Sequence, residues 1–314
     1  MPISEFDFNS IKDYITSSKD ETLNSLAKKR GLRYTGSSSS MTGLLSHFHF
    51  LLSNWRLINV SMLSKNFPVS TKKFTKWCKA PSSVLLRYKD GSYAIDNDNS
   101  LQTDNVLSLL GKSMEKLLTL DPDTYERYRK SNGNPITHTE REKPEIYNYT
   151  SYGNILMRSQ LDAYDPRLPG SGLFDLKSRA VVSIRMELEN HERGSGYEIR
   201  YDQGQWESFE REYHDMVRAT LLKYALQVRI GRMDGIFVAY HNVERIFGFQ
   251  YISLEEMDLA LHGVKNTSLG NHEFQLSLKL LNEVLDRVVE RFPEQVIVNL
   301  PLSCSLLILP SLVS

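Results

Sequence analysis

The chain has 314 residues, enough for one large domain or two small ones. Lysine plus arginine and aspartate plus glutamate each number 38, so net charge does not indicate a nucleic-acid partner, and any such surface must be local. The two cysteines, Cys78 and Cys304, lie far apart, which excludes a disulfide scaffold or a zinc module and suits a reducing compartment.

The two ends of the chain carry no clear targeting or membrane signal. Residues 1–21 contain several acids and no apolar core, so they are typical of neither a signal peptide nor a transit peptide. Residues 295–314 are apolar, but Pro301 and Pro310 interrupt them. We therefore expect no transmembrane segment and treat residues 293–314 as an atypical apolar tail.

The first 100 residues predict an extension of helices and one hairpin, packed on or flanking a later core. Helical pieces are expected at 11–17 and 22–30, and a longer helix at 41–55 that begins in the serine run 37–40. Asp90-Gly91 predicts the turn of a hairpin over 84–95. His47 and His49 in the longer helix are two residues apart and do not share a face, which favours core or surface histidines over metal ligands.

The stretch 70–80 interleaves lysines with aromatic residues. Lys72, Lys73 and Trp77 could neutralise phosphates and stack on bases, which makes them candidates for RNA binding. A solvated face anchored by Phe74 and Trp77 explains the same pattern.

Residues 101–292 predict an α/β domain. Helices are expected at 105–120, where Glu115 is the only acid, and at 206–230, 254–262 and 272–291. Strands are expected at 197–201, 235–240 and 245–252, in addition to a hairpin over 159–185. This order predicts a mixed β-sheet with helices packed on it.

The hairpin places two acids opposite one another. If its turn is centred between Leu168 and Pro169, paired residue numbers sum to 337, and Asp162 faces Asp175. Facing carboxylates repel, and a bridging divalent cation, Mg²⁺ or Mn²⁺, would offset the repulsion. Lys177 shares a face with Asp175 and could hold a water or neutralise a phosphate. Asp165 is the alternative first acid, although its place before a proline favours a turn role.

The sequence predicts a helix with Glu115, a strand with Asp162, a strand with Asp175 and Lys177, and then a long helix. This order resembles the PD-(D/E)xK nuclease superfamily, and its RecB-like exonucleases in particular. That resemblance implies a restriction-endonuclease-like αβα core and Mg²⁺-dependent phosphodiester hydrolysis. Longer strings resemble the fungal mitochondrial RNA-degradation family, whose members are petite-associated proteins: SSSSMTGLLSHFHFLLSNW, LDAYDPRLPGSGLFDLKSRAVVSIR, GQWESFEREYHDM and LQVRIGRMDGIFVAYHNVERIFGFQYISLEEMDLALHG.

The resemblance implies a 5′-to-3′ exoribonuclease in mitochondria, although the presequence of that family is not evident here. It implies that Asp162, Asp175 and Glu115 bind the metal, that Lys177 is catalytic, and that Gln227 matches a helical position of the RecB-like members with Tyr224 before it. Further candidates for phosphate contacts are Arg179, Arg229 and Arg232. Single-stranded RNA is the implied substrate, and other mitochondrial RNA-turnover proteins are possible partners. The alternative is a non-catalytic RNA-binding scaffold on the same fold.

Overall fold

The computed structural model describes residues 1–80, 82–98, 105–293, 296–300 and 307–310. Its strands are β1 (Tyr34–Ser37), β2 (Ser82–Lys89), β3 (Ser92–Asn97), β4 (Tyr147–Tyr152), β5 (Ile155–Gln160), β6 (Ala163–Tyr164), β7 (Leu173–Ala180), β8 (Gly235–His241), β9 (Ile246–Ser253), β10 (Val296–Leu300) and β11 (Leu307–Pro310). Its α-helices are α1 (Glu21–Arg30), α2 (Ser38–Leu52), α3 (Val106–Thr119), α4 (Pro122–Glu126), α5 (His138–Arg141), α6 (Val182–Met186), α7 (Phe209–Ala219), α8 (Leu221–Gly231), α9 (Leu254–His262) and α10 (Ser268–Arg291).

The larger sheet joins the two ends of the chain to its middle. Its strand order is β11-β10-β2-β3-β1-β5-β4, with β1 parallel to both β3 and β5. The first 100 residues and the described part of the tail thus contribute strands to the sheet that contains β4 and β5. A domain boundary near residue 100 remains a prediction.

The smaller sheet carries the predicted hairpin. Its order is β6-β7-β8-β9, with β7 parallel to β8 and the other pairs antiparallel. Ala163 pairs with Phe174 and Tyr164 with Leu173, so paired numbers sum to 337 and the predicted register is confirmed. The first strand is shorter than expected, because residues 155–160 leave the hairpin and pair with β1 and β4.

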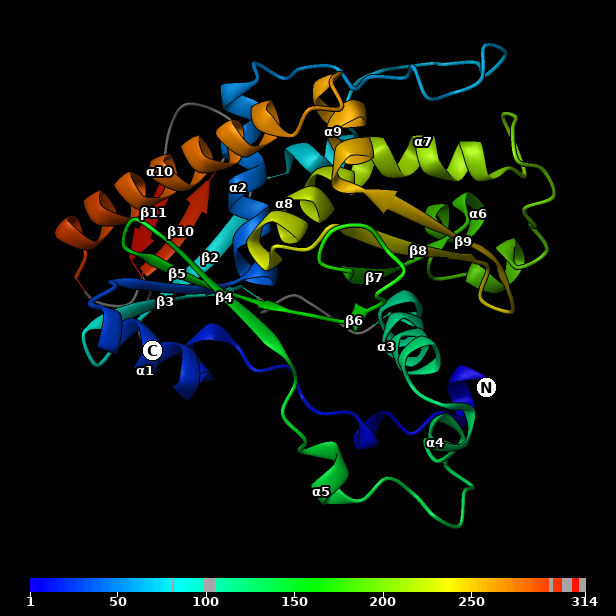
Figure 1. Cartoon of the computed structure of the whole chain (residues 1–314), viewed down its shortest axis with the longest axis horizontal. Coiled ribbons are helices and arrows are strands. Elements are labelled where there is room, and N and C mark those ends of the chain that lie inside the picture. The colour runs from blue at the N-terminus through cyan, green and yellow to red at the C-terminus, as the bar shows by residue number, and fades with distance from the viewer. Residues whose placement is uncertain (81, 99–104, 294–295, 301–306, 311–314) are drawn as a thin grey trace.

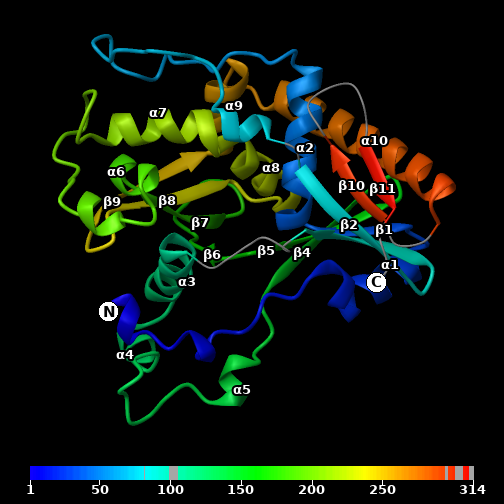
Figure 2. The same ribbon diagram turned by 180° about the vertical axis from the view of Figure 1, so that it is seen from behind.

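Helices cover both faces of the sheets (Figure 1). α2 and α8 pack between the sheets and the outer helices α9 and α10, whereas α1 lies on the opposite face of the larger sheet (Figure 2). Buried apolar side chains of α2, α8 and α10, such as Leu44, Leu226 and Leu285, form the core with β5 and β8. The αβα arrangement and the mixed sheet are confirmed.

The expected helix over 206–230 is broken in two, and the longest helix is α10 instead. The break follows from a tertiary contact with residues 75–78. The Thr75 N–H donates to the Arg218 carbonyl at 3.1 Å, and the Cys78 thiol lies 3.0 Å from the Ala219 carbonyl. Carbonyls that a continuous helix would use are therefore occupied, and the chain turns at Thr220.

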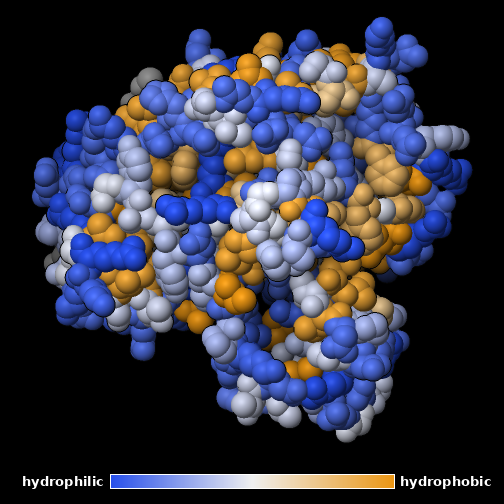
Figure 3. Space-filling model, in the orientation of Figure 1, coloured by the Kyte–Doolittle hydropathy of each residue, from blue (hydrophilic) through white to orange (hydrophobic). Residues whose placement is uncertain are grey.

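Two shorter elements were also predicted wrongly. Residues 197–201 form no strand beyond an isolated bridge between Tyr201 and Ser208, and residues 11–17 form no α-helix. The serine run does begin α2, since Ser37 and Ser40 form a capping box. Across the described residues, no helix is both long and apolar enough to span a membrane. The face in Figure 3 is mostly polar, with apolar side chains in scattered patches.

Candidate active site

The five residues predicted to be catalytic come from four segments and line one cavity of about 380 Å³. α3 contributes Glu115, the segment before β6 contributes Asp162, β7 contributes Asp175 and Lys177, and α8 contributes Gln227. The structure thus brings together all five residues predicted to be catalytic.

The two aspartates form the centre of this cavity. Asp175 is 1 % exposed, and the Asp162 carboxylate accepts the Leu176 N–H at 2.9 Å. Burial, and then the facing carboxylate of Asp175, raise the pKa of Asp162 to about 8. With this pKa, Asp162 is mostly protonated at neutral pH when no divalent cation is bound.

Lys177 supplies the positive charge of the cavity. Its Nζ forms an ion pair with Asp175 and lies 5.3 Å from the centre of the Tyr224 ring. Burial disfavours the ammonium, but the carboxylates of Asp175 and Asp162 outweigh that effect and raise the pKa of Lys177. Lys177 therefore stays protonated near neutral pH, so it acts as a cation and not as a base.

Gln227 holds the second aspartate in place. Its Nε2 donates to Asp175 Oδ1 at 3.2 Å, which orients the carboxylate. The helical position of Gln227 on α8, one turn beyond Tyr224, places both side chains on the same wall.

Glu115 lies farther from Asp162 and Asp175 than it would if all three side chains bound one cation. Its Oε1 lies 3.2 Å from Lys116 Nζ. Burial raises the pKa of Glu115, and the charge of Asp162 adds to the rise. Among the described residues, only His49, His262 and Glu273 bring three candidate ligand atoms within 4.8 Å of one another.

The residues present fit a hard divalent cation. Asp175 Oδ2 is buried and lacks a hydrogen-bond partner within the described residues, apart from its ion pair with Lys177. The donors are all carboxylate oxygens, which are the ligands that Mg²⁺ and Mn²⁺ prefer. Asp162 and Asp175 would hold the ion, with Glu115 facing them from α3.

Part of the cavity lining comes from N-terminal residues that were not predicted from the sequence. Ser37, Ser38 and Ser39 at the start of α2 line it, and the Tyr14 hydroxyl lies 2.7 Å from Ser37 Oγ. Arg158, which is bound to Asp20, lies on the same wall. These residues reach the site because β1 pairs in parallel with β5, a long-range contact that no local pattern reveals.

Asp165 does not line the cavity. Its carboxylate binds the backbone and side chain of Arg167, and those hydrogen bonds lower the pKa of Asp165 to about 2. Asp165 thus stabilises the turn, whereas Asp162 faces the site.

None of the three arginines proposed as phosphate contacts lines this cavity. The Arg229 guanidinium is buried, and its Nη2 donates to both carboxylate oxygens of Asp258, at 2.7 and 2.6 Å. Arg232 is exposed at the C-terminal end of α8 and lines a different pocket with Arg229. Arg179, by contrast, follows Lys177 on the same face of β7.

The buried pair gives a prediction for Arg229. Arg229→Met is expected to destabilise the fold by about 3 kcal/mol, because it leaves the buried Asp258 carboxylate without its arginine partner and with only His262 paired to it among the described residues. Chemical denaturation measures this, with the exposed neighbour Arg232→Met as the matched control near zero. A stable Arg229→Met variant that bound RNA poorly would instead support a phosphate contact.

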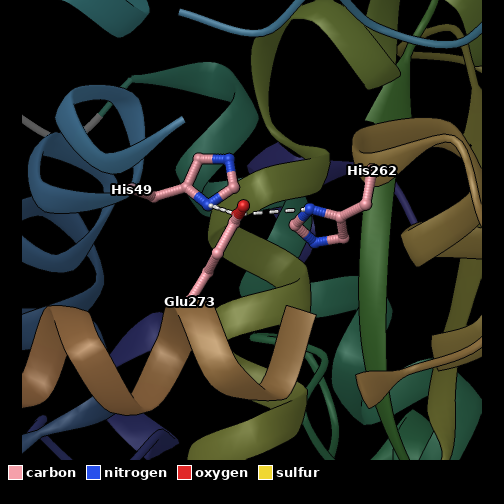
Figure 4. Close-up of side chains that lie close together, drawn as sticks. All are labelled: His49, His262 and Glu273. Atoms are coloured by element: carbon pink, nitrogen blue, oxygen red, sulfur yellow. Dashed lines mark ion pairs between the residues drawn. The ribbon is translucent and has the colours of Figure 1, made fainter. Parts of the chain in front are cut away.

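His49 belongs to a separate buried network between α2, α9 and α10 (Figure 4). Its Nδ1 lies 3.1 Å from Glu273 Oε2, and His262 Nδ1 lies 3.4 Å from the same atom. Arg56 pairs with Glu273 and donates to His262 Nδ1 at 2.9 Å. Arginine charge thus balances the acid, and the network joins three helices without needing a metal.

The comparisons with known proteins agree with the sequence strings. A family model described as mitochondrial protein Pet127 matches residues 14–286. The chain belongs to the Pet127 family. The family and its mitochondrial location, both implied by the resemblance, are therefore confirmed.

Two relatives carry the Pet127 name. The chain is 41% identical over 303 residues to the Schizosaccharomyces pombe protein called mRNA degradation protein pet127, mitochondrial, covering 94% of this chain and 57% of that protein. It is 46% identical over 277 residues to a Saccharomyces cerevisiae protein called putative mitochondrial translation system component PET127, covering 86% of this chain and 32% of that protein. The chain thus spans about half the length of the S. pombe relative and about a third of the length of the S. cerevisiae relative.

Solved structures share the fold. A mutant S. pombe Rai1 in complex with 3′-FADP has a TM-score of 0.51 at 10% identity, covering 100% of this chain and 83% of that chain. Candida albicans Rai1 in complex with pU5 and Mn²⁺ has a TM-score of 0.45 at 12% identity, covering 99% of this chain and 80% of that chain. The first of these similarities confirms that this Pet127 member has a fold of the Rai1 type.

The raised pKa of Asp162 gives a prediction on stability. Between about pH 4 and pH 8 this carboxyl ionises in the unfolded chain but stays protonated in the folded chain, so folding takes up a proton and stability falls as pH rises. Without divalent cations, Asp162→Asn is expected to raise Tm by a few degrees at pH 8 and to leave it unchanged at pH 4. Thermal unfolding with chelator measures this.

The control is Asp123→Asn, an exposed acid on α4, which should behave as the natural chain at both pH values. Added Mg²⁺ at pH 8 should raise the Tm of the natural chain more than that of Asp162→Asn. An equal effect of the mutation at both pH values would mean that Asp162 is not the titrating group.

Proposed function

We propose that the chain is a divalent-cation-dependent exoribonuclease that degrades mitochondrial RNA from its 5′ end. The observation that carries the proposal is the pair of facing aspartates, Asp175 buried and Asp162 partly exposed, beside Lys177 in one cavity. A divalent cation held there would polarise a phosphodiester and acidify a water.

Each residue has a role that follows from its position. Asp162 and Asp175 hold the cation, and Gln227 fixes the Asp175 carboxylate by its hydrogen bond. Lys177 donates to a non-bridging oxygen of the scissile phosphate and stabilises the charge that develops there. Tyr224 packs against the Lys177 ammonium and keeps it directed into the cavity.

RNA as the substrate is supported by the name of the S. pombe relative, an mRNA degradation protein. The polarity rests on the resemblance to the mitochondrial RNA-degradation family. Because the chain spans only part of its relatives, the activity of the whole protein is part of the proposal.

Two labelled substrates test the polarity. Single-stranded RNA labelled at the 5′ end should lose its label as a mononucleotide at the earliest times, whereas the same RNA labelled at the 3′ end should shorten progressively. Early mononucleotide release from the 3′ label alone would reverse the polarity. Cleavage of DNA at the same rate would remove the RNA preference.

A non-catalytic RNA-binding scaffold is the second candidate, and one observation favours it. Glu115, the third acid of the set, stands apart from the aspartates and pairs with Lys116. The scaffold predicts RNA binding without hydrolysis in Mg²⁺ or Mn²⁺.

A further inference from the structure

A second cavity, of about 550 Å³, lies along the same two elements as the candidate active site. β7 lines the first cavity with Asp175 and Lys177 and the second with Arg179. α8 lines the first with Gln227 and the second with Lys223. Alternate residues of a strand share a face, so the two cavities are neighbours on one side of β7.

The second cavity is rich in cations. Its lining includes Arg179, Arg185, Arg211 and Lys223, against one acid, Asp215. Asp215 lies 3.0 Å from both Arg185 and Arg211, and Arg185 also pairs with the buried Glu212, so these two acids offset these two arginines. The first cavity has the opposite character, since its centre is two aspartates.

Arg179 is the buried cation of this cavity. It is 6 % exposed, and its Nε lacks a hydrogen-bond partner within the part of the chain that the structure describes. Burial, and then the nearby charge of Arg185, lower the pKa of Arg179 to about 10. A buried guanidinium N–H without an acceptor is costly, and an anion in the cavity would offset that cost.

The start of α8 faces the same space. Thr220 occupies the N-cap position but makes no side-chain capping bond, and its buried Oγ1 lacks a partner among the described residues. A helix N-terminus favours phosphate through its dipole and its free N–H groups. The unpartnered Thr220 hydroxyl and Arg179 Nε therefore line the same cavity as this helix N-terminus, which itself favours an anion.

An exposed aromatic residue lies at the edge of the second cavity. Trp77 lines the cavity and is 89 % exposed, which is unusual for a tryptophan. The hydrogen bonds of Thr75 and Cys78 to the end of α7 hold its segment in place. Exposed aromatic rings beside a cationic groove are the stacking platforms of proteins that bind single strands.

We propose that this second cavity binds the RNA phosphate next to the scissile one, with Arg179 as its main ligand and Trp77 stacked on the attached base. The step from Lys177 to Arg179 along β7 is about 6–7 Å, which suits consecutive phosphates of an extended strand. The assignment rests on the proposed function, because that function defines the scissile phosphate.

Binding in chelator tests the proposal without any need for hydrolysis. The probe is a 5′-phosphorylated ten-nucleotide RNA, followed by fluorescence anisotropy at several salt concentrations. Arg179→Met is expected to weaken binding about tenfold and to reduce the slope of log affinity against log salt by about 0.7, the value for one phosphate on a single strand. Trp77→Ala, on an exposed side chain that cannot disturb the core, is expected to weaken binding about tenfold with the slope unchanged.

Arg287→Met, on the exposed side of α10 and outside both cavities, is the matched control and should bind as the natural chain. Uridine 5′-monophosphate, measured in Mg²⁺ so that the first cavity can hold a phosphate, distinguishes the two phosphate positions, because it should occupy only the first cavity and be indifferent to Arg179→Met. An equal loss for the mononucleotide and the RNA would assign Arg179 to the terminal phosphate and overturn the proposal. Unchanged RNA affinity in both variants would overturn it as well.

The two hypotheses can fail separately. The chain could bind RNA through Arg179 and Trp77 but never cleave it. That result would remove the nuclease activity and keep the second cavity as a phosphate site, although no scissile phosphate would then lie next to it. Mg²⁺-dependent cleavage by the natural chain, with unchanged binding in both variants, would keep the nuclease and remove the phosphate site.

Discussion

Replacing Asp175 by asparagine is expected to lower the rate of Mg²⁺-dependent RNA hydrolysis on the order of 10³-fold. The asparagine keeps the shape of the side chain, but it removes one of the two charges that would hold the cation. The fold should tolerate the change, because it also removes the Asp175 charge that helps to raise the pKa of Asp162. Initial rates on end-labelled RNA measure the effect.

Two controls show that the loss is chemical. Asp123→Asn should hydrolyse RNA at the natural rate, since that acid is exposed on α4. Asp175→Asn should still bind RNA in chelator with nearly natural affinity. Full activity in Asp175→Asn would remove the facing aspartates from the mechanism.

Lys177→Met is expected to lower kcat by about 10²–10³-fold while changing KM little. The ammonium is held by the carboxylates and by Tyr224 inside the cavity, where a charge is worth more than in water. Because its pKa is raised, the natural chain should lose no activity through Lys177 between pH 7 and pH 9. Single-turnover rates across that pH range measure both expectations.

The matched control is Lys279→Met, an exposed lysine on α10. A similar loss in both variants would indicate a general effect of charge on RNA binding. A rise in KM with unchanged kcat in Lys177→Met would move Lys177 from the reacting phosphate to substrate binding.

The local elements around the site could be predicted from the sequence. The turn at Pro166 to Gly170 set the register that opposes Asp162 and Asp175, and the alternation along β7 placed Lys177 beside them. The apolar pattern of 106–119 predicted α3 with Glu115, and residues 254–262 form α9 as expected. Such features depend on turn chemistry and periodicity, which a single sequence contains.

The features that were missed depend on contacts distant in sequence. β1 is four residues long and has no apolar run, yet its parallel pairing with β5 brings Ser37 to the candidate site. The break at Thr220 depends on Thr75 and Cys78, which lie far earlier in the chain. Arg229 was predicted to contact phosphate, but its ion-pair partner Asp258 lies on another helix.

The central claim is that the cavity of Asp162, Asp175 and Lys177 hydrolyses RNA with a divalent cation. The most direct measurement follows a 5′-phosphorylated single-stranded RNA with the natural chain in Mg²⁺, in Mn²⁺ and in chelator. We expect mononucleotide release with either metal, and RNA that stays bound and intact with chelator. RNA that remains bound but intact in both metals would contradict the claim and identify the chain as a scaffold on a nuclease fold.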